Sequence, residues 1–275
     1  MKRSSTESRG ETQKRSHNRT SSRLVRFTNC RLARGLCLVN EDLWTLDGKI
    51  IDPKSRWWTS NSNNEFLEPL EISCNGAILA PGYYDVQING GFGIDFADSS
   101  HVTLEKMAEV SHKLLSHGVV AYLPTIISSS PQTYSKLIPK HNEIKNILND
   151  RNKTLDNNNN NNYDDDDDFD PRHTKANDVN FINKPRAKIL GLHLEGPFMH
   201  PSKKGAHDIN CLSEPVDGMT SLMDTYGSLQ GVKLITLAPE LNGSFQAISD
   251  LHSQGVIVSM GHTSASFEQV FLSTK

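Results

Sequence analysis

The sequence predicts an α/β protein built around a parallel sheet. From about residue 76 onward, short apolar runs alternate with segments of helical periodicity. The runs are apolar throughout, without interleaved polar residues, as is typical of strands buried on both faces. Strands that alternate with helices lie parallel in one sheet, because each helix crosses over between two strands.

The first predicted element is a small β unit over residues 24–75. Residues 36–39 and 50–51 are apolar, and Leu46-Asp47-Gly48-Lys49 has the composition of a turn. Short apolar runs separated by turn residues predict hairpins. The tail that precedes this unit, residues 1–23, contains almost nothing apolar after its first residue and is expected to be disordered.

The sheet and its helices occupy residues 76–275. Strands are expected near residues 77–89, 119–126, 188–195, 232–238 and 256–261. Helices are expected over residues 104–115, 132–149 and 245–251, and again after the last strand. An insert at about residues 150–185 carries runs of Asn and Asp that cannot bury apolar surface, so we expect it to be disordered. The Asp run lacks the glycine turn and ligand spacing of a calcium loop.

Composition excludes several classes of protein. The sequence contains no run of about 18 apolar residues, which rules out a membrane span, and its N-terminus lacks the apolar core of a secretory signal. Its four cysteines form no CxxC pair, which favours a reducing, cytoplasmic setting over a disulfide framework. Residues 1–35 carry ten Lys/Arg against two Asp/Glu. No aromatic residue is interleaved to stack on bases, so a solvated tail is favoured over nucleic-acid binding.

Two strands deliver metal-ligating residue types to the same end of the sheet. Glu195 ends a buried strand just before a Gly-Pro loop, where a carboxylate is costly unless it is paired or bound to metal. His193 shares its strand face. This motif alone is equally consistent with two roles for Glu195. One is metal binding or catalysis, and the other is capping of a neighbouring loop. A lone histidine after a strand, such as His262, is more often structural, but Glu and His from two strands together favour a metal such as zinc.

Two further segments are candidates for substrate contact. The loop Lys203-Lys204-Gly205-Ala206-His207-Asp208 is either a solvated basic loop or a contact for an anionic or hydroxylated substrate. Gln87 and Asn89 share a face at the end of the first sheet strand, where their amides can orient a water or a carbonyl. An amide is too weakly basic to act as a general base.

Several motifs in register resemble one enzyme family. Residues 80–93 resemble the first-strand motif of the N-acetylglucosamine-6-phosphate deacetylase family, in the amidohydrolase superfamily. Further family motifs follow in order and spacing at residues 191–198, 203–207, 236–240 and 261–262. The resemblance runs from about Phe27 to the last residue and is interrupted by the insert. It implies a partial (β/α)8 TIM-type barrel with a small β-sandwich made from both chain ends.

The resemblance also implies a reaction and a set of site residues. The family hydrolyses the N-acetyl group of N-acetylglucosamine 6-phosphate to glucosamine 6-phosphate and acetate. Gln87 and Asn89 stand where most amidohydrolases have His-x-His, which resembles the single-metal branch. One divalent ion, expected to be zinc, would be held by Glu195, His262 and a further His on the next strand. His207 and the backbone near Ala206 would contact the sugar.

The resemblance predicts that part of the site lies outside this sequence. A complete barrel has eight strands, and the third metal ligand and a proton-transferring Asp are expected beyond Lys275, together with the dimer loops that bind phosphate. We therefore expect a homodimer for the full-length form, and weak metal binding and no turnover for the isolated chain. The alternatives are another amidohydrolase, such as a cyclic amidase, and a non-catalytic fragment that associates with the full-length enzyme through its open sheet edge.

Overall fold

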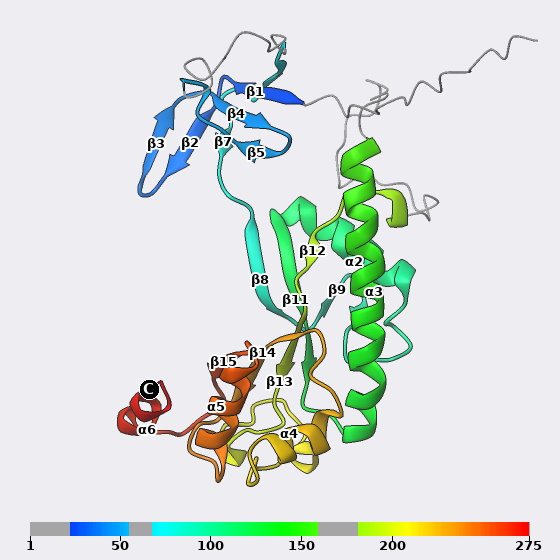
Figure 1. Cartoon of the computed structure of the whole chain (residues 1–275), viewed down its shortest axis with the longest axis vertical. Coiled ribbons are helices and arrows are strands. Elements are labelled where there is room, and N and C mark those ends of the chain that lie inside the picture. Colours follow the sequence, from blue (N-terminus) through cyan, green and yellow to red (C-terminus); the bar gives the residue numbers. More distant parts are fainter. Residues whose placement is uncertain (1–22, 55–67, 159–180, 275) are drawn as a thin grey trace, which may run out of the picture. The chain divides into compact units, whose positions relative to one another are not determined.

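The computed structural model describes residues 23–54, 68–158 and 181–274, with side chains described except over residues 151–158. The chain divides into two compact units, one ending at Pro81 and the other beginning at Gly82 (Figure 1). The basic tail and most of the insert lie outside the described residues, so the expectations for them stay predictions.

The first unit is built from two small sheets. One has the strand order β5-β4-β1-β6 and the other β3-β2-β7; the β1–β6 and β2–β7 pairs are parallel and the remaining pairs antiparallel. Asp47 and Gly48 have φ values of 50° and 74° between β4 and β5, as the two-residue turn of a twisted hairpin requires. The strands are β1 (Leu24–Thr28), β2 (Arg31–Arg34), β3 (Cys37–Asn40), β4 (Leu43–Leu46), β5 (Lys49–Ile50), β6 (Leu70–Ser73) and β7 (Ile78–Leu79).

The second unit contains a curled parallel sheet whose strands lie side by side in chain order (Figure 1). β11 pairs with β8 on one side and with β12 and β13 on the other, followed by β14 and β15, and every one of these pairs is parallel. This half-barrel confirms the predicted α/β class and parallel sheet. The strands are β8 (Tyr83–Ile88), β11 (Val119–Ile127), β12 (Lys188–Ile189), β13 (Leu192–Glu195), β14 (Val232–Leu237) and β15 (Ile257–Met260); a separate hairpin joins β9 (Gly90–Gly91) to β10 (Ile94–Asp95).

The strand expected over residues 77–89 is wrong in its first part. Ile78–Leu79 forms β7 and pairs with β2 in the first unit, so the half-barrel strand begins only at Tyr83. Pro81, which lacks an N–H, interrupts the ladder between the two strands. Gly82 then passes so close to β11 that an added Cβ would lie 2.3 Å from Val120 Cγ1.

The strand expected over residues 188–195 is likewise divided in two. β12 ends at Ile189 and β13 begins at Leu192, and both pair with β11. Gly191 lies between them, where an added Cβ would meet the carbonyl oxygen of Gly231 at 2.7 Å. The close approach of these two backbones explains the break and the need for glycine.

Helices pack along the outer side of this sheet (Figure 1). The helix expected over residues 132–149 begins one residue earlier and continues through part of the expected insert, because no Gly or Pro follows Pro139 before Asn158. The short α4 was not anticipated. The helices are α2 (Leu104–Leu114), α3 (Pro131–Asn158), α4 (Met219–Tyr226), α5 (Ser244–Ser253) and α6 (Phe267–Ser273), with 3-10 turns η1 (Leu115–His117), η2 (Phe181–Asn183), η3 (Pro201–Lys203) and η4 (Ile209–Cys211).

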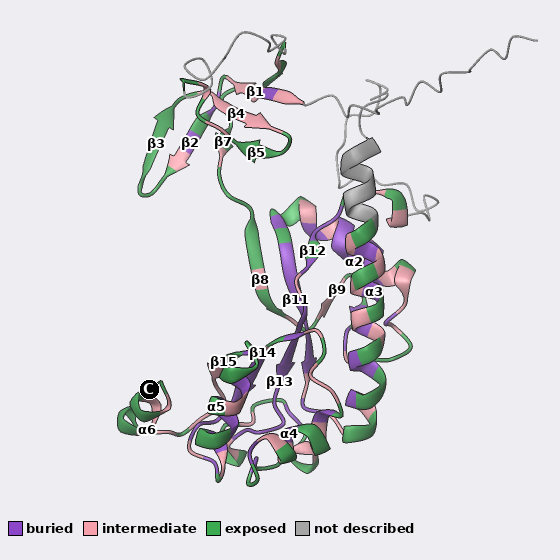
Figure 2. Cartoon of the chain, in the orientation of Figure 1, coloured by how far each residue is buried: buried purple, intermediate pink, exposed green. Residues whose placement is uncertain are grey.

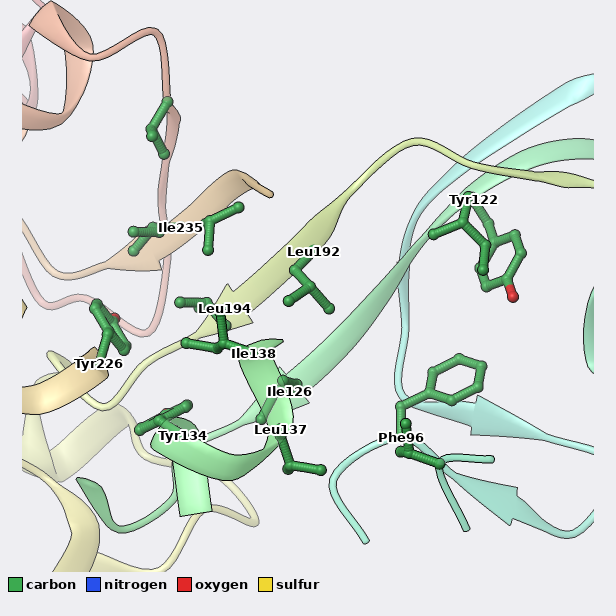
Figure 3. Packing of buried hydrophobic residues seen from close by; sticks show 14 of the residues in the cluster. Phe96, Tyr122, Ile126, Tyr134, Leu137, Ile138, Leu192, Leu194, Tyr226 and Ile235 are labelled. Atoms are coloured by element: carbon green, nitrogen blue, oxygen red, sulfur yellow. The ribbon is translucent and has the colours of Figure 1, made fainter. Parts of the chain in front are cut away.

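The hydrophobic core lies between these helices and the central strands. Its largest side chains include Phe96, Tyr122, Tyr134 and Tyr226, all fully buried (Figure 3). Figure 2 shows β11, β13 and β14 largely buried and β8 largely exposed. β8 and β15 form the two edges of the sheet. In the described part of the chain, no helix has the length and apolarity needed to cross a membrane.

Candidate functional site

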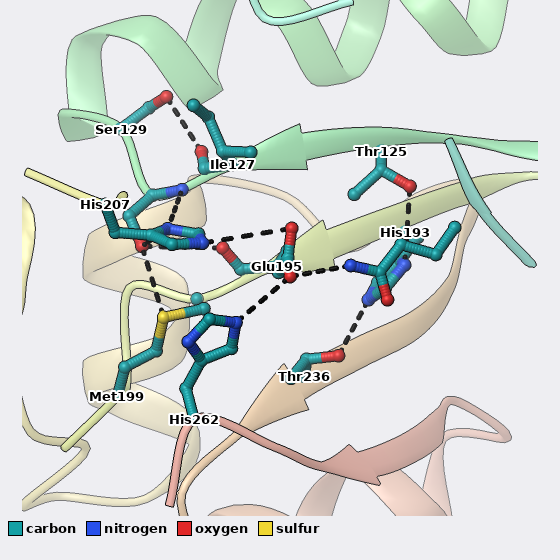
Figure 4. A network of polar contacts seen from close by, with 12 residues as sticks. Thr125, Ile127, Ser129, His193, Glu195, Met199, His207, Thr236 and His262 are labelled. Carbon is teal, nitrogen blue, oxygen red and sulfur yellow. Dashed lines mark hydrogen bonds and ion pairs between the residues drawn. The ribbon is translucent and has the colours of Figure 1, made fainter. Parts of the chain in front are cut away.

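A carboxylate and two imidazoles converge at the carboxyl ends of the parallel strands (Figure 4). Glu195 is the last residue of β13, and its side chain is only 7% exposed. Its Oε1 accepts a hydrogen bond of 2.6 Å from Nε2 of Gln87, which lies near the end of β8. A carboxylate removed from water in this way requires partners of positive or donor character.

His262 reaches the same carboxylate oxygen from the loop that follows β15. Its Nε2 lies 3.1 Å from Glu195 Oε1, and its Nδ1 lies 2.8 Å from the carbonyl oxygen of Lys203. Because a carbonyl only accepts, Nδ1 carries the proton of the neutral ring and Nε2 turns its lone pair toward Glu195. Two lone pairs facing each other repel, so this contact needs a proton or a metal cation between the two atoms.

His207 approaches the other carboxylate oxygen in a different protonation pattern. Its Nε2 lies 3.9 Å from Glu195 Oε2, while its Nδ1 lies 2.8 Å from the Ser128 hydroxyl and accepts the backbone N–H of Ser128, a group that only donates, at 3.3 Å. The neutral ring therefore carries its proton on Nε2. Burial lowers the pKa of His207, helped by the nearby His262 and Lys204 and opposed by Glu195. His207 thus presents an N–H donor where His262 presents a lone pair.

These three side chains could hold a metal ion. Their ligand atoms all lie within 4.8 Å of one another, and the two imidazole rings are 4.8 Å apart. Two ligands of one tetrahedral zinc ion are separated by about 3.3 Å, given zinc–ligand distances of about 2.0–2.1 Å. The 3.1 Å between His262 Nε2 and Glu195 Oε1 is close to this value. The structure thus brings together the two residues expected to bind metal, and their role as ligands stays a prediction.

Of the other expected site residues, Gln87 contacts the cluster, whereas Asn89 and Ala206 lie exposed. Gln87 joins the cluster, but as a donor to Glu195, whereas the sequence suggested a group that orients water or a carbonyl. Asn89 lies just past the end of β8 and is exposed, and in the described structure its side chain makes no hydrogen bond to Glu195, His207 or His262. Ala206 is exposed in the loop beside His207.

His193 forms a polar network below the cluster that sequence reasoning missed (Figure 4). Its Nδ1 lies 3.0 Å from the carbonyl oxygen of Val86 on β8, and its Nε2 lies 2.8 Å from Oγ1 of Thr236 on β14. Burial lowers the pKa of His193 to about 4 despite the attraction of Glu195, so the ring is neutral at pH 7. The ring of His193, two residues before Glu195 on β13, therefore connects this strand to β8 and β14. The only sequence signal was that His193 and Glu195 share a face.

The loop after Glu195 is held by two buried tyrosines. The hydroxyl of Tyr226 on α4 donates to the carbonyl oxygen of Gly196 at 2.9 Å. The single hydroxyl proton of Tyr134 on α3 is shared between this oxygen at 3.1 Å and the carbonyl oxygen of Ile127 at 3.2 Å. Gly196 has a φ of 83°, and an added Cβ would lie 2.3 Å from Ser128 Oγ. Only glycine fits this position without displacing the residue that contacts His207.

Comparisons with known proteins place this geometry in a family context. No protein-family model matches the chain. The chain is 36% identical over 244 residues to N-acetylglucosamine-6-phosphate deacetylase of Homo sapiens, covering 88% of this chain and 50% of that protein. It is 35% identical over 247 residues to the enzyme of the same name from Danio rerio, covering 90% of this chain and 51% of that protein.

The fold is also similar to that of a solved structure. The crystal structure of N-acetylglucosamine-6-phosphate deacetylase from Pasteurella multocida matches with a TM-score of 0.59 at 23% identity, covering 91% of this chain and 54% of that one. The chain spans about half the length of the curated relatives it matches. It is therefore a homologue of about one half of the N-acetylglucosamine-6-phosphate deacetylases, which confirms the resemblance seen in its motifs.

Proposed function

We propose that this chain supplies metal-binding residues of a deacetylase. This enzyme hydrolyses N-acetylglucosamine 6-phosphate to glucosamine 6-phosphate and acetate. The observation that supports the proposal is the convergence of Glu195 and His262, carried by separate strands, on one point at the carboxyl end of the half-barrel. This end of a parallel barrel is where active sites are built. The substrate class comes from the names of the relatives.

In this proposal Glu195 and His262 hold one divalent ion, expected to be zinc. The Lys203 carbonyl fixes the His262 tautomer that leaves Nε2 free to bind metal, a support that metal-binding histidines commonly have. The amide of Gln87 orients the carboxylate through its hydrogen bond to Oε1. When bound, such an ion supplies Lewis-acid polarisation of the acetamide carbonyl and makes water nucleophilic near neutral pH.

His207 is proposed to bind the sugar. Its Nε2–H is directed into the cluster and can donate to a sugar hydroxyl, because Ser128 occupies Nδ1. The backbone at Ala206 and the amide of Asn89 are proposed to contact the substrate beside it. Lys204 supports this loop from within, since its Nζ donates to the carbonyl oxygen of His207 at 3.1 Å. Lys203, which is exposed, adds positive charge for an anionic substrate.

Zinc titration of the 275-residue chain tests the metal site directly. Glu195→Gln and His262→Ala are expected to lower zinc affinity by more than about a hundredfold, since loss of a ligand exceeds the ~10–100-fold effect of outer partners. His252→Ala is the matched control, because His252 is an exposed histidine on α5. Unchanged zinc binding in Glu195→Gln would contradict the proposal.

Activity is best tested in a full-length relative. The residues equivalent to Glu195 and His262 in the human protein are substituted in the same way, and acetate release from N-acetylglucosamine 6-phosphate is measured. Both substitutions are expected to abolish turnover. An active variant would exclude these two positions as the metal ligands. A homodimeric full-length form is part of the same proposal, as is a cytoplasmic setting, which the four free cysteines support.

A second candidate role is non-catalytic association with a full-length deacetylase. The observation that favours it is the exposed apolar surface at both sheet edges, where Tyr83 of β8 is 70% exposed and Ile257 of β15 is 63% exposed. Unpaired sheet edges are templates for pairing with another chain. Co-expression with a tagged full-length relative should recover the chain in the eluate, and a monodisperse monomer that does not co-elute would contradict this role.

A further inference from the structure

Glu240 links the loop that follows β14 to the loop that follows β15. Its Oε2 accepts a short hydrogen bond from the hydroxyl of Thr263. Its Oε1 accepts the backbone N–H of Ser264 at 2.6 Å and the Ser264 hydroxyl at 3.2 Å. One carboxylate therefore binds three donors from two consecutive residues of the neighbouring loop.

The residue immediately before these two donors is His262, and its backbone is in an unusual conformation. His262 has a φ of 52°, in the left-handed region that residues other than glycine seldom adopt. Such a conformation persists where surrounding contacts hold it. On one side, the His262 carbonyl accepts the backbone N–H of His200 at 3.0 Å, and the ring contacts the Lys203 carbonyl. On the other side, the contacts of the next two residues are those with Glu240.

We propose that Glu240 is a positioning residue that keeps His262 in this left-handed turn and so directs Nε2 at Glu195. The Glu240 carboxylate makes no hydrogen bond or ion pair with the side chain of His262 or of Glu195 in the described structure, so its effect passes through Thr263 and Ser264. The proposal rests on the proposed function only in that it treats the imidazole as a metal ligand.

The variants distinguish the loss of the Glu240 hydrogen bonds from a general loss of stability in the loop. Glu240→Ala removes all three hydrogen bonds. Glu240→Gln is the conservative rescue, because its oxygen can accept the Ser264 N–H and its amide can donate to Thr263 Oγ1. Glu214→Ala is the matched control, since Glu214 is an exposed carboxylate nearby that accepts from Asn242 at 2.6 Å. If Glu240→Ala does not fold, as judged by circular dichroism, Thr263→Val takes its place. This variant removes one of the three bonds to Glu240 and also the bond from the Ala265 N–H to Thr263 Oγ1 at 2.9 Å.

The first measurement needs no metal. Long-range proton–nitrogen NMR of the full chain, with labelled histidine, reports which ring nitrogen of His262 carries the proton. The native chain is expected to show the Nδ1-protonated form, and Glu240→Ala is expected to shift the signals toward the average of free histidine. Glu240→Gln should restore them, and Glu214→Ala should leave them unchanged. His262 signals in Glu240→Ala that match the native chain would overturn the proposal.

The second measurement is zinc affinity by chelator competition. Glu240→Ala is expected to bind zinc about tenfold more weakly than the native chain, at the lower end of the effect of partners that orient a ligand. Glu240→Gln should recover most of this loss. If the native chain binds zinc and Glu240→Ala binds it equally well, the positioning role is refuted and the metal site stands. If the native chain does not bind zinc, the metal site fails and the NMR signals alone decide the positioning role.

Discussion

The two tyrosines that hold the loop after Glu195 are predicted to differ in how much their hydroxyls stabilise the fold. Among the described residues the Tyr226 hydroxyl contacts only the Gly196 carbonyl, which also has Tyr134 as a donor. Tyr226→Phe should therefore lower the free energy of unfolding by about 1 kcal/mol, the usual contribution of one hydrogen bond. The Tyr134 hydroxyl also accepts the backbone N–H of Ser129 at 3.1 Å, so Tyr134→Phe leaves that donor unpaired. Its cost should be about 2 kcal/mol.

Urea unfolding of the single and double variants measures this difference. Phenylalanine keeps the edge-to-face ring pair, whose centroids are 5.0 Å apart, so only the hydroxyl is tested. The double variant leaves the buried carbonyl of Gly196 without either phenol, so it should cost more than the sum of the singles by about 0.5 kcal/mol or more. A Tyr226→Phe cost equal to or above that of Tyr134→Phe would refute this reading of the network, as would strict additivity.

Three further predictions test the pH response, the backbone and the sheet edges. Burial lowers the pKa of His141 to about 4, so the unfolded chain binds a proton more readily. Stability should fall as pH drops from 6.5 toward 4, by about 3 kcal/mol for this group, and His141→Leu should flatten that slope in urea melts recorded against pH. Gly196→Ala should destabilise the fold by about 2–5 kcal/mol, because the cost of the left-handed backbone adds to a clash of the new Cβ with Ser128. Gly205→Ala has room for a Cβ and should cost only about 1 kcal/mol. Equal losses in the two unfolding curves would contradict the clash. Ile257→Lys should reduce co-elution with the tagged full-length relative while leaving the melting temperature unchanged. Undiminished co-elution would exclude the β15 edge as the contact.

The convergence of Glu195 and His262 could be predicted because it depends only on topology. Apolar runs that alternate with helices indicate parallel strands, and the carboxyl ends of parallel strands meet at one rim. A residue at the end of β13 and one just after β15 must then lie at that rim. The same reasoning placed Gln87 there. It could not show that the amide of Gln87 faces a carboxylate, since this depends on the rotamers of both side chains.

The sequence did not predict which side chains of neighbouring strands pair, or which strands and helix ends differ from the local pattern. Neighbouring strands β13 and β14 bring His193 and Thr236 within 2.8 Å, but nothing in either motif marks them as partners. The expected strand over residues 77–89 was wrong at its start, because the assignment of Ile78–Leu79 to another sheet depends on pairing with β2. Local pattern does not encode this choice between competing partners. Likewise, the extension of α3 follows from missing helix breakers, which the polar composition of that segment obscured.

The distinction between the two imidazoles at Glu195 arises from unpredicted loop contacts. A neutral imidazole has one donor and one acceptor nitrogen, and in each histidine the group that contacts Nδ1 decides which nitrogen is which. A carbonyl oxygen of the β13 loop, from Lys203, makes His262 a lone-pair donor, whereas the N–H of Ser128 after β11 makes His207 a proton donor. Exchanging the two supporting groups would exchange the two functions without altering either histidine. The chemistry of the rim is therefore set by the loop backbone as much as by the side chains that the motifs display.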